Sequence, residues 1–230
     1  MDYILEGLSE ALRLLFNLNP EIREIALLSI MVSTSSTLIA SLLGIPLGFI
    51  VAHYDFQGKG IIITILNTLL SLPTVVVGLL VFSFISNQGP LGNLELLYTP
   101  LGIIMGQTIL ALPIVVTLSL NVIKESEDKI IDTALSLGAS KRQAMILLFK
   151  EVRFGILGAV ITAYGRVIGE VGLSMMVGGN IRRVTRTLTT AIAMETSKGE
   201  FGFGLALGII LMTIALAINL VLHYFQEVRV

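Results

Sequence analysis

The stretch DTALSLGASKRQA, residues 132–144, is polar although long apolar runs flank it on both sides. Its first half fits a helix that ends near Leu137, because Gly138 readily takes the left-handed backbone that closes a helix. Ser140 and Gln143 have the spacing of a capping box, which would start a second helix. The stretch therefore predicts a helix, a tight turn and a second helix, with the turn exposed to water.

Five apolar windows make up most of the remaining chain. The protein has 230 residues, of which 54% are hydrophobic and 13% are charged, and its mean hydropathy is +0.91. A helix needs about 20 predominantly apolar residues to cross a hydrocarbon core about 30 Å thick. The windows cover residues 25–51, 61–86, 101–123, 154–178 and 202–225. They predict an all-α integral membrane protein with five transmembrane helices in a single domain, residues 19–230.

The N-terminal residues 1–18 have a different pattern. Apolar residues recur there at three- and four-residue steps, and polar residues take the other face. We expect an amphipathic helix that lies on the membrane surface or packs against the spans. Asn19, Pro20 and Glu21 then supply an N-cap, a proline at the first helical position and an acid in the first turn. The first membrane helix is expected to start at this point.

Several classes of function are excluded by what the chain lacks. The net charge of −1 gives no general attraction to nucleic acid, and with no cysteine and only two histidines a metal centre is not expected. No phosphate-binding loop occurs, because the nearest fragment, QGKG at residues 57–60, lacks both the upstream glycine and the hydroxyl residue. We therefore predict no enzyme activity and no cofactor on this chain, so any ATP hydrolysis belongs to a partner.

The polar stretch at residues 132–144 allows three interpretations. A DNA-binding helix-turn-helix is disfavoured, because a neutral chain that crosses a membrane offers no basic face to a duplex. The second interpretation is a plain cytoplasmic loop. The third is a docking element, in which a short helix fits a groove on a soluble partner and passes movement to the adjacent spans.

The spacing in this stretch resembles the EAA loop of permease subunits in ABC importers. Leu148 stands at the isoleucine position of the family pattern, whereas Lys150 and Glu151 stand where Leu-Pro is expected. The resemblance implies a coupling helix that docks into an ABC ATP-binding subunit. The residues it assigns to this loop are Asp132, Thr133, Ala134, Gly138, Ser140, Lys141 and Arg142.

The fourth window contains two ionisable residues, Arg166 and Glu170, four positions apart on one helical face. Ions at membrane depth cost roughly 2.5 to 3.5 kcal/mol on insertion scales, so they usually face a protein interior or a watery cavity. The pair either neutralises itself internally or lines and gates a pathway. We assign the pathway or gate also to Asn180 and to the prolines Pro73 and Pro113, which would kink their spans.

Glycine pairs at four-residue spacing predict close helix packing. They are Gly44 with Gly48, Gly165 with Gly169, and Gly204 with Gly208.

Three arginines follow the fourth window, Arg182, Arg183 and Arg186, and threonines are interleaved with them. Guanidinium and hydroxyl groups suit an oxyanion, and three positive charges would concentrate anions at a mouth. A solvated loop, or an anchor to lipid headgroups, explains the same charges.

Three runs in this region resemble the oxyanion permeases of the molybdate, tungstate and sulfate group. They are GRVIGEVG, MVGGNI and TRTLTTAI. The run MMVGGNI, together with Lys150 and Glu151, is most similar to the tungstate-type permeases. The resemblance extends from about residue 25 onward and implies the type I ABC importer permease fold.

The resemblance also implies an assembly and a location. We expect two copies of this chain to form one pathway in the cell membrane, with two ATP-binding subunits that hold ATP and Mg²⁺, an extracytoplasmic binding protein that delivers the oxyanion, and lipid around the spans. A cytoplasmic coupling loop and five spans place the N-terminus outside and the C-terminus inside. The alternatives are a molybdate or sulfate ABC permease, or a proton-coupled secondary carrier that uses Glu170.

Overall fold

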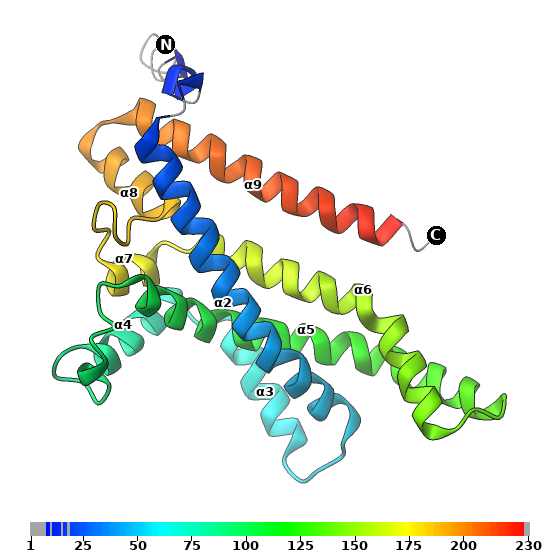
Figure 1. Ribbon diagram of the computed structural model, residues 1–230. Coiled ribbons are helices and arrows are strands. Elements are labelled where there is room, and N and C mark those ends of the chain that lie inside the picture. Colours follow the sequence, from blue (N-terminus) through cyan, green and yellow to red (C-terminus); the bar gives the residue numbers. More distant parts are fainter. Residues whose placement is uncertain (1–7, 10, 15, 18, 228–230) are drawn as a thin grey trace.

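The chain is built from helices. The computed structural model describes residues 8–227 except 10, 15 and 18, and these residues contain no strand, which confirms the predicted all-helical membrane architecture. The helices are α2 (Pro20–His53), α3 (Lys59–Leu70), α4 (Thr74–Ile85), a short 3₁₀ helix (Gly92–Leu94), α5 (Pro100–Ser136), α6 (Lys141–Ile168), α7 (Gly172–Gly178), α8 (Leu188–Lys198) and α9 (Phe201–Glu227). Figure 1 shows their arrangement.

Three described helices are long and apolar enough to cross a membrane: α2, α5 and the part of α9 at residues 201–220. The window at 61–86 was expected to be one helix, but it forms α3 and α4, which are bent by 101°. Pro73 is the reason for the break, because it stands at the N-cap of α4 with an extended backbone instead of inside a helix. The pair counts as a fourth span if it crosses the membrane as one broken unit.

The fourth window, residues 154–178, is also not one helix. α6 ends at Ile168, and α7 begins only at Gly172. Gly169 and Glu170 lie between them, and the Glu170 amide donates to the Val167 carbonyl at 3.1 Å. The interruption places an ionisable residue on irregular backbone, which membrane proteins tolerate only where that backbone is buried in protein or lines a cavity.

Close packing of α2 on α5 organises the fold. A Cβ built on Gly44 would lie 2.9 Å from Val115 Cγ1, and one on Gly48 would lie 2.8 Å from the Val116 carbonyl. The predicted packing role of this glycine pair is confirmed. The predicted start of α2 is also confirmed, since the Asn19 side chain accepts a hydrogen bond from the Glu21 amide at 2.9 Å.

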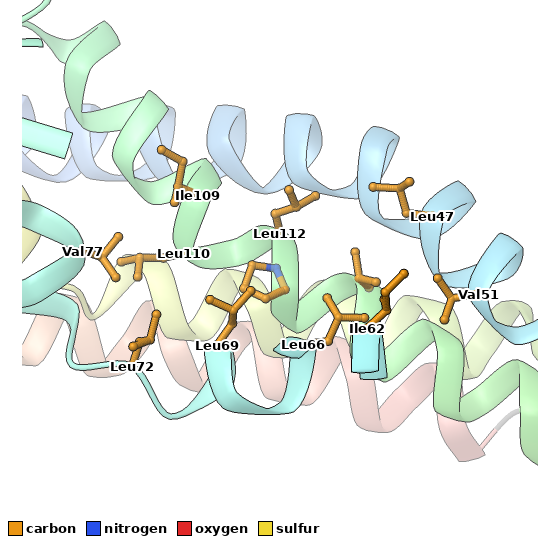
Figure 2. A pocket seen from close by; sticks show the side chains of 12 residues that line it. Leu47, Val51, Ile62, Leu66, Leu69, Leu72, Val77, Ile109, Leu110 and Leu112 are labelled. Carbon is orange, nitrogen blue, oxygen red and sulfur yellow. The ribbon is translucent and has the colours of Figure 1, made fainter. Parts of the chain in front are cut away.

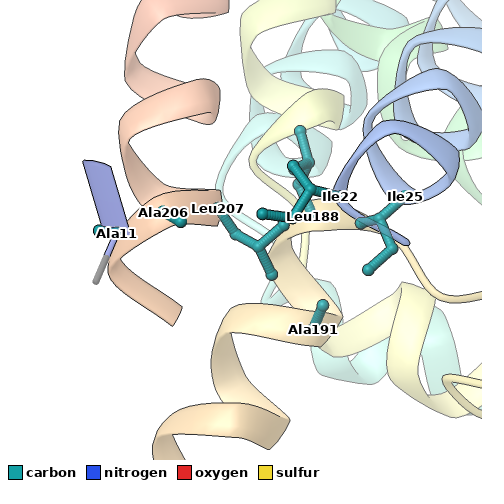
Figure 3. Packing of buried hydrophobic residues seen from close by; sticks show 7 residues of the cluster. All are labelled: Ala11, Ile22, Ile25, Leu188, Ala191, Ala206 and Leu207. Carbon is teal, nitrogen blue, oxygen red and sulfur yellow. The ribbon is translucent and has the colours of Figure 1, made fainter. Parts of the chain in front are cut away.

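A second cluster joins the start of α2 to α8 and α9. Ile22 and Ile25 of α2 pack with Leu188 of α8 and Leu207 of α9 (Figure 3). Ala11 is also buried there, although much of the predicted amphipathic helix, residues 1–7, 10, 15 and 18, lies outside the described residues.

An apolar pocket of about 430 Å³ lies between α2, α3, α4 and α5. Leu66 and Leu69 of α3 point toward Leu112 of α5 across it (Figure 2). Pro113 lines this pocket and remains inside α5, so the structure places it among aliphatic side chains.

The two ends of the molecule differ. At one end α5 and α6 extend as a helical hairpin, and the C-terminal end of α9 points to the same side (Figure 1). α8 and the described start of the chain lie at the other end. α6 has 28 residues, which corresponds to a length of about 42 Å, so the hairpin tip and Glu170 are far apart.

Candidate functional site

The polar stretch at residues 132–144 forms the tip of the hairpin. Gly138 takes the left-handed backbone with a φ of +85°. The Ala139 amide donates to the Ala134 carbonyl at 3.0 Å, and the Gly138 amide donates to the Leu135 carbonyl at 2.9 Å. This pair of bonds is the Schellman closure of a helix.

Ser140 then starts α6 with a capping box. Its side chain accepts from the Gln143 amide at 3.3 Å, and the Gln143 side chain accepts from the Ser140 amide at 2.8 Å. The predicted helix, turn and helix are confirmed. Of the seven residues assigned to the loop, Ala134 is buried, and the other six are exposed: Asp132, Thr133, Gly138, Ser140, Lys141 and Arg142.

Arg166 and Glu170 form an ion pair at the break between α6 and α7. The Arg166 Nη1 atom lies 3.2 Å from Glu170 Oε2. Glu170 Oε1 accepts from the Leu173 amide at 3.1 Å, and the Thr189 hydroxyl donates to the Glu170 carbonyl at 2.8 Å. The Glu170 side chain is 3% exposed, whereas that of Arg166 is 48% exposed. Glu170 is thus tied to α7 and α8, while about half of the Arg166 side chain remains accessible.

The two helix breaks meet beside Glu170. A Cβ built on Gly172 would lie 2.9 Å from Val75 Cγ2, 3.7 Å from Thr74 Oγ1 and 3.5 Å from Glu170 Oε1. The start of α4, which Pro73 caps, therefore packs against the start of α7. Pro73 and Glu170 are brought into one region, although Pro113 belongs to the apolar pocket.

One face of α6 beside Arg166 is open. A Cβ built on Gly165 would meet nothing within 4 Å, and one on Gly169 would meet only carbonyls of its own helix. Thr162 is exposed on the preceding turn. Close packing was predicted for Gly165 and Gly169, but within one copy they have no neighbouring helix. The result is a polar, uncovered strip around a charged side chain in the fourth window.

Asn180 follows α7 with a left-handed backbone, at a φ of +51°. Its side chain is buried, and neither amide atom has a hydrogen-bond partner among the described residues. Gly179 precedes it and packs against the Tyr98 ring, which leaves no room for a Cβ.

The predicted anion mouth is the arginine cluster Arg182, Arg183 and Arg186. Arg182 Nε donates to Glu21 Oε1 at 2.8 Å, and this hydrogen bond raises the pKa of the guanidinium. Arg186 Nη1 lies 3.3 Å from the same oxygen and 3.4 Å from Glu195 Oε1. Carboxylates from α2 and α8 thus neutralise part of this cluster.

Arg183 is the arginine with the loosest contact. Its Nε atom lies 3.9 Å from Glu24 Oε2, and its side chain is 78% exposed. An exposed pair at that distance contributes little to stability, so Arg183 keeps its charge available to solvent.

Comparison with known proteins places this arrangement in a family. A family model described as a binding-protein-dependent transport system inner membrane component matches residues 44–228, from the second half of α2 to the end of α9. The chain belongs to this family.

Relatives along nearly the whole length carry a more specific name. The tungstate uptake system permease protein of Peptoclostridium acidaminophilum is 40% identical over 99% of this chain and 100% of its own length. That of Campylobacter jejuni is 43% identical over 99% of this chain and 95% of its own length. The probable anion ABC transporter permease protein of Haloferax volcanii is 40% identical over 88% and 90%. Relatives named for sulfate or molybdenum transport are 28% identical or less.

These comparisons confirm the predicted resemblance to the oxyanion permeases. The permease is a multi-pass protein of the cell membrane and one component of an ABC uptake system, a role that calls for ATP-binding and substrate-binding partners. Relatives over almost the full length are named permease proteins, so the chemistry of ATP hydrolysis belongs to another subunit. Among the described residues of the permease, no group of three acidic or histidine side chains could hold a metal ion.

A buried amide in the permease was missed by the sequence analysis. Gln107 lies in an apolar part of α5, its Nε2 donates to the Val167 carbonyl at 3.2 Å, and its Oε1 accepts from the Ser36 hydroxyl at 3.1 Å. Val167 is in the last turn of α6, where carbonyls lose their helical partners. A polar residue amid apolar ones was the available signal, because such residues usually bond across membrane helices.

The threonine run also has a structural role in the permease. Thr187 caps α8 through a capping box with Thr190. The Leu188 amide in the first turn of α8 donates to the Ser29 hydroxyl of α2 at 2.7 Å. The threonine hydroxyls therefore cap α8 and bond the Glu170 carbonyl instead of standing free at a mouth, while Ser29 fixes α8 against α2.

Proposed function

We propose that this permease carries tungstate inward across the membrane as the translocating subunit of an ATP-driven importer. The observation that carries the proposal is the 40% and 43% identity to two tungstate uptake permeases over 99% of the chain. Molybdate is the next candidate and sulfate follows, because relatives named for them are more distant. Tungstate and molybdate are tetrahedral dianions of similar size, so both would fit one path.

The hairpin tip is the proposed docking element for the ATP-binding subunit. Leu137 is 83% exposed and stands between acidic and basic residues of the tip. An apolar side chain with a charged rim suits the groove of a soluble partner. The Schellman turn and the capping box make the tip rigid, so a force applied there would tilt both arms together. ATP and Mg²⁺ belong to that partner.

Five membrane crossings follow from treating α6 as a span. α6 has 28 residues, enough to cross about 30 Å of hydrocarbon, although its charged start keeps its mean hydropathy low. With α2, the α3–α4 pair, α5 and α9, the chain then crosses five times. The N-terminus would be outside and the C-terminus inside, on the side of the hairpin.

The open strip on α6 is the proposed wall of the pathway. Two copies of the chain would bring two such strips together and exclude lipid from them, while lipid contacts the outer faces of the spans. Arg166 would attract the dianion within the path, since ionisable residues at membrane depth mark ion routes. Glu170 would hold Arg166 in place and keep the α6–α7 break ordered, and Asn180 would lie along the same route.

The arginine cluster is the proposed outer mouth. Glu21 and Glu195 reduce its charge, so we expect it to guide an anion briefly instead of binding it tightly. An extracytoplasmic binding protein would release the oxyanion beside Arg182 and Arg183, whose side chains are 63% and 78% exposed.

A proton-coupled carrier based on Glu170 receives less support. Glu170 accepts hydrogen bonds from Arg166 and from the Leu173 amide, so both carboxylate oxygens are already engaged by protein groups. A proton carrier needs a carboxyl group that can exchange protons with water, whereas the Glu170 side chain is 3% exposed.

The test is uptake into vesicles that contain this chain, its ATP-binding subunit and its binding protein. We expect tungstate uptake that requires ATP, with molybdate as the stronger competitor and sulfate as the weaker one. Uptake that runs on an imposed proton gradient without ATP would overturn the importer and support the carrier. ATP-driven uptake of sulfate in preference to both metal oxyanions would overturn the substrate assignment alone.

A further inference from the structure

The C-terminal end of α2 contacts both arms of the hairpin. His53 Nδ1 lies within hydrogen-bonding distance of Glu127 Oε1 of α5. The Phe49 ring, one turn earlier on α2, lies 4.9 Å from the Phe149 ring of α6 and stacks on His53 at 5.3 Å. We name Phe49, His53, Glu127 and Phe149 the α2 junction.

A buried cluster surrounds the α2 junction. Val51 of α2 packs with Leu120 and Ile123 of α5 and with Leu148 of α6, and all four are buried. Protein interiors are close-packed and resist small deformations, so a rigid tilt of the hairpin must move the α2 end with it.

The corner after α2 is fastened as well. Lys59 Nζ donates to the Ala52 carbonyl at 3.0 Å and to Asp55 at 3.0 Å, and the latter hydrogen bond lowers the pKa of the Asp55 carboxyl. These bonds hold the segment after α2 close to the helix end at His53.

Glu127 lies on the part of α5 that leads to the docking element, so its contact with His53 can pass movement from that element to α2. α5 has 37 residues, a length of about 55 Å, which exceeds the thickness of the hydrocarbon core. Glu127 precedes Asp132 of the docking element by five residues. The pair thus links the end of α2 to the arm that leads to the docking element.

We infer that His53 and Glu127 are positioning residues that transmit movement of the hairpin to α2 during transport. The inference rests on the proposed function, because it takes the hairpin tip as the place where the ATP-binding subunit acts. Without the pair, only the apolar contacts of the junction join α2 to the hairpin, so α2 follows the tilt less closely and more ATP is hydrolysed for each ion translocated.

The first experiment measures tungstate taken up per ATP hydrolysed in the reconstituted assembly. For Glu127→Gln and His53→Gln we expect uptake per ATP to fall about fivefold or more, with ATP hydrolysis retained. Glu125→Gln is the matched control, because Glu125 is exposed on the same stretch of α5. Exchange of the two groups, His53→Glu with Glu127→His, should restore most of the ratio.

The second experiment reports movement directly and does not depend on uptake. The chain contains no cysteine, so labels at Gln57→Cys and Lys150→Cys, both exposed positions outside the docking element, need no background substitutions. We expect the distance between these labels to change little with ATP in the parent assembly and to change clearly in Glu127→Gln.

Two results would overturn the inference. One is an unchanged ratio of uptake to ATP in both single variants. The other is an equal loss of uptake and ATP hydrolysis, with no change in how the labels move, which is what a purely structural pair would give. The proposed function fails separately, through a parent assembly whose uptake does not require ATP.

Discussion

The Arg166 guanidinium lies 3.2 Å from the Glu170 carboxylate, yet the Arg166 side chain is 48% exposed and that of Glu170 is 3% exposed. The two partners of one ion pair thus have different environments. Glu170 bonds to the protein on both oxygens, whereas Arg166 uses one of its nitrogen atoms among the described contacts. Glu170 is therefore the anchor of the pair, and Arg166 supplies the accessible cation.

Substitution of Glu170 should mainly affect stability. In Glu170→Ala the Leu173 amide would lose its acceptor in a buried place, which costs about 1 to 3 kcal/mol. Thermal unfolding in detergent measures this loss. Glu170→Gln keeps an acceptor for the amide and should lose less, and equal losses in both variants would contradict the anchoring role.

Substitution of Arg166 should mainly affect transport. Arg166→Gln removes an accessible cation, and one charged hydrogen bond to the anion corresponds to about tenfold in uptake or more. Arg166→Lys keeps the charge and should retain part of the activity. Initial rates of tungstate uptake provide the measurement, and full activity of Arg166→Gln would remove this residue from the path.

The two glycine pairs offer a contrast. Gly48→Ala would bring a Cβ to 2.8 Å from the Val116 carbonyl, so we expect a loss of stability of about 1 to 3 kcal/mol from overpacking. Gly165→Leu meets open space within one copy and should leave the stability of the subunit unchanged while it blocks uptake. Thermal unfolding and uptake, measured on both variants, separate the two roles. If Gly165→Leu transports normally, the open strip is not the wall of the pathway.

The turn at Gly138 can be tested with little damage to the fold. Nothing lies within 4 Å of a Cβ built there, so the cost of Gly138→Val is the left-handed backbone, about 1 to 2 kcal/mol. We expect the helices to remain inserted and uptake per ATP to fall. Gly138→Asn is the control, since asparagine accepts this conformation more readily. Equal behaviour of the two variants would argue against a strict requirement for this turn.

The arginine cluster should act through long-range charge. Reversal of Arg182, Arg183 and Arg186 to glutamate should slow anion uptake most at low ionic strength, because 0.1 M salt screens interactions between exposed charges that are more than about 10 Å apart. Arg23→Glu, an exposed charge on the first turn of α2, is the control. The measurement is the initial rate of anion uptake by each variant over a series of salt concentrations. A loss of equal size at every salt concentration would point to a structural role of the Glu21 pairs.

Local signals in the sequence predicted the ends of helices well. Asn19 caps α2, Gly138 closes α5 and Ser140 caps α6, as expected. Each of these features depends on residues within about one turn of one another, so the neighbouring sequence determines them.

The broken spans could not be predicted in the same way. The window that contains α3 with α4 is mostly apolar, and the one that contains α6 with α7 has a single ionisable residue, Glu170, at its break. Hydropathy identifies such windows but does not give the direction in which the chain runs. Pro73 was noted as a kink, but a 101° turn depends on the packing of α4 against α7.

Contacts between residues that are far apart in the sequence could not be predicted from it either. Glu21 and Arg182 are 161 positions apart, and His53 and Glu127 are 74 positions apart. The charge of Arg182 was visible in the sequence, but its carboxylate partner is defined only by the packing of α2 beside the loop after α7.

The central claim is that the hairpin tip is the cytoplasmic docking element for the ATP-binding subunit. Cross-linking from one introduced cysteine tests this claim most directly. Lys141→Cys places a thiol on the exposed tip of a chain with no other cysteine. We predict cross-links to the ATP-binding subunit, and labelling by a membrane-impermeant reagent only in inside-out vesicles. Cross-links to the extracytoplasmic binding protein, or labelling of intact cells from outside, would contradict the account.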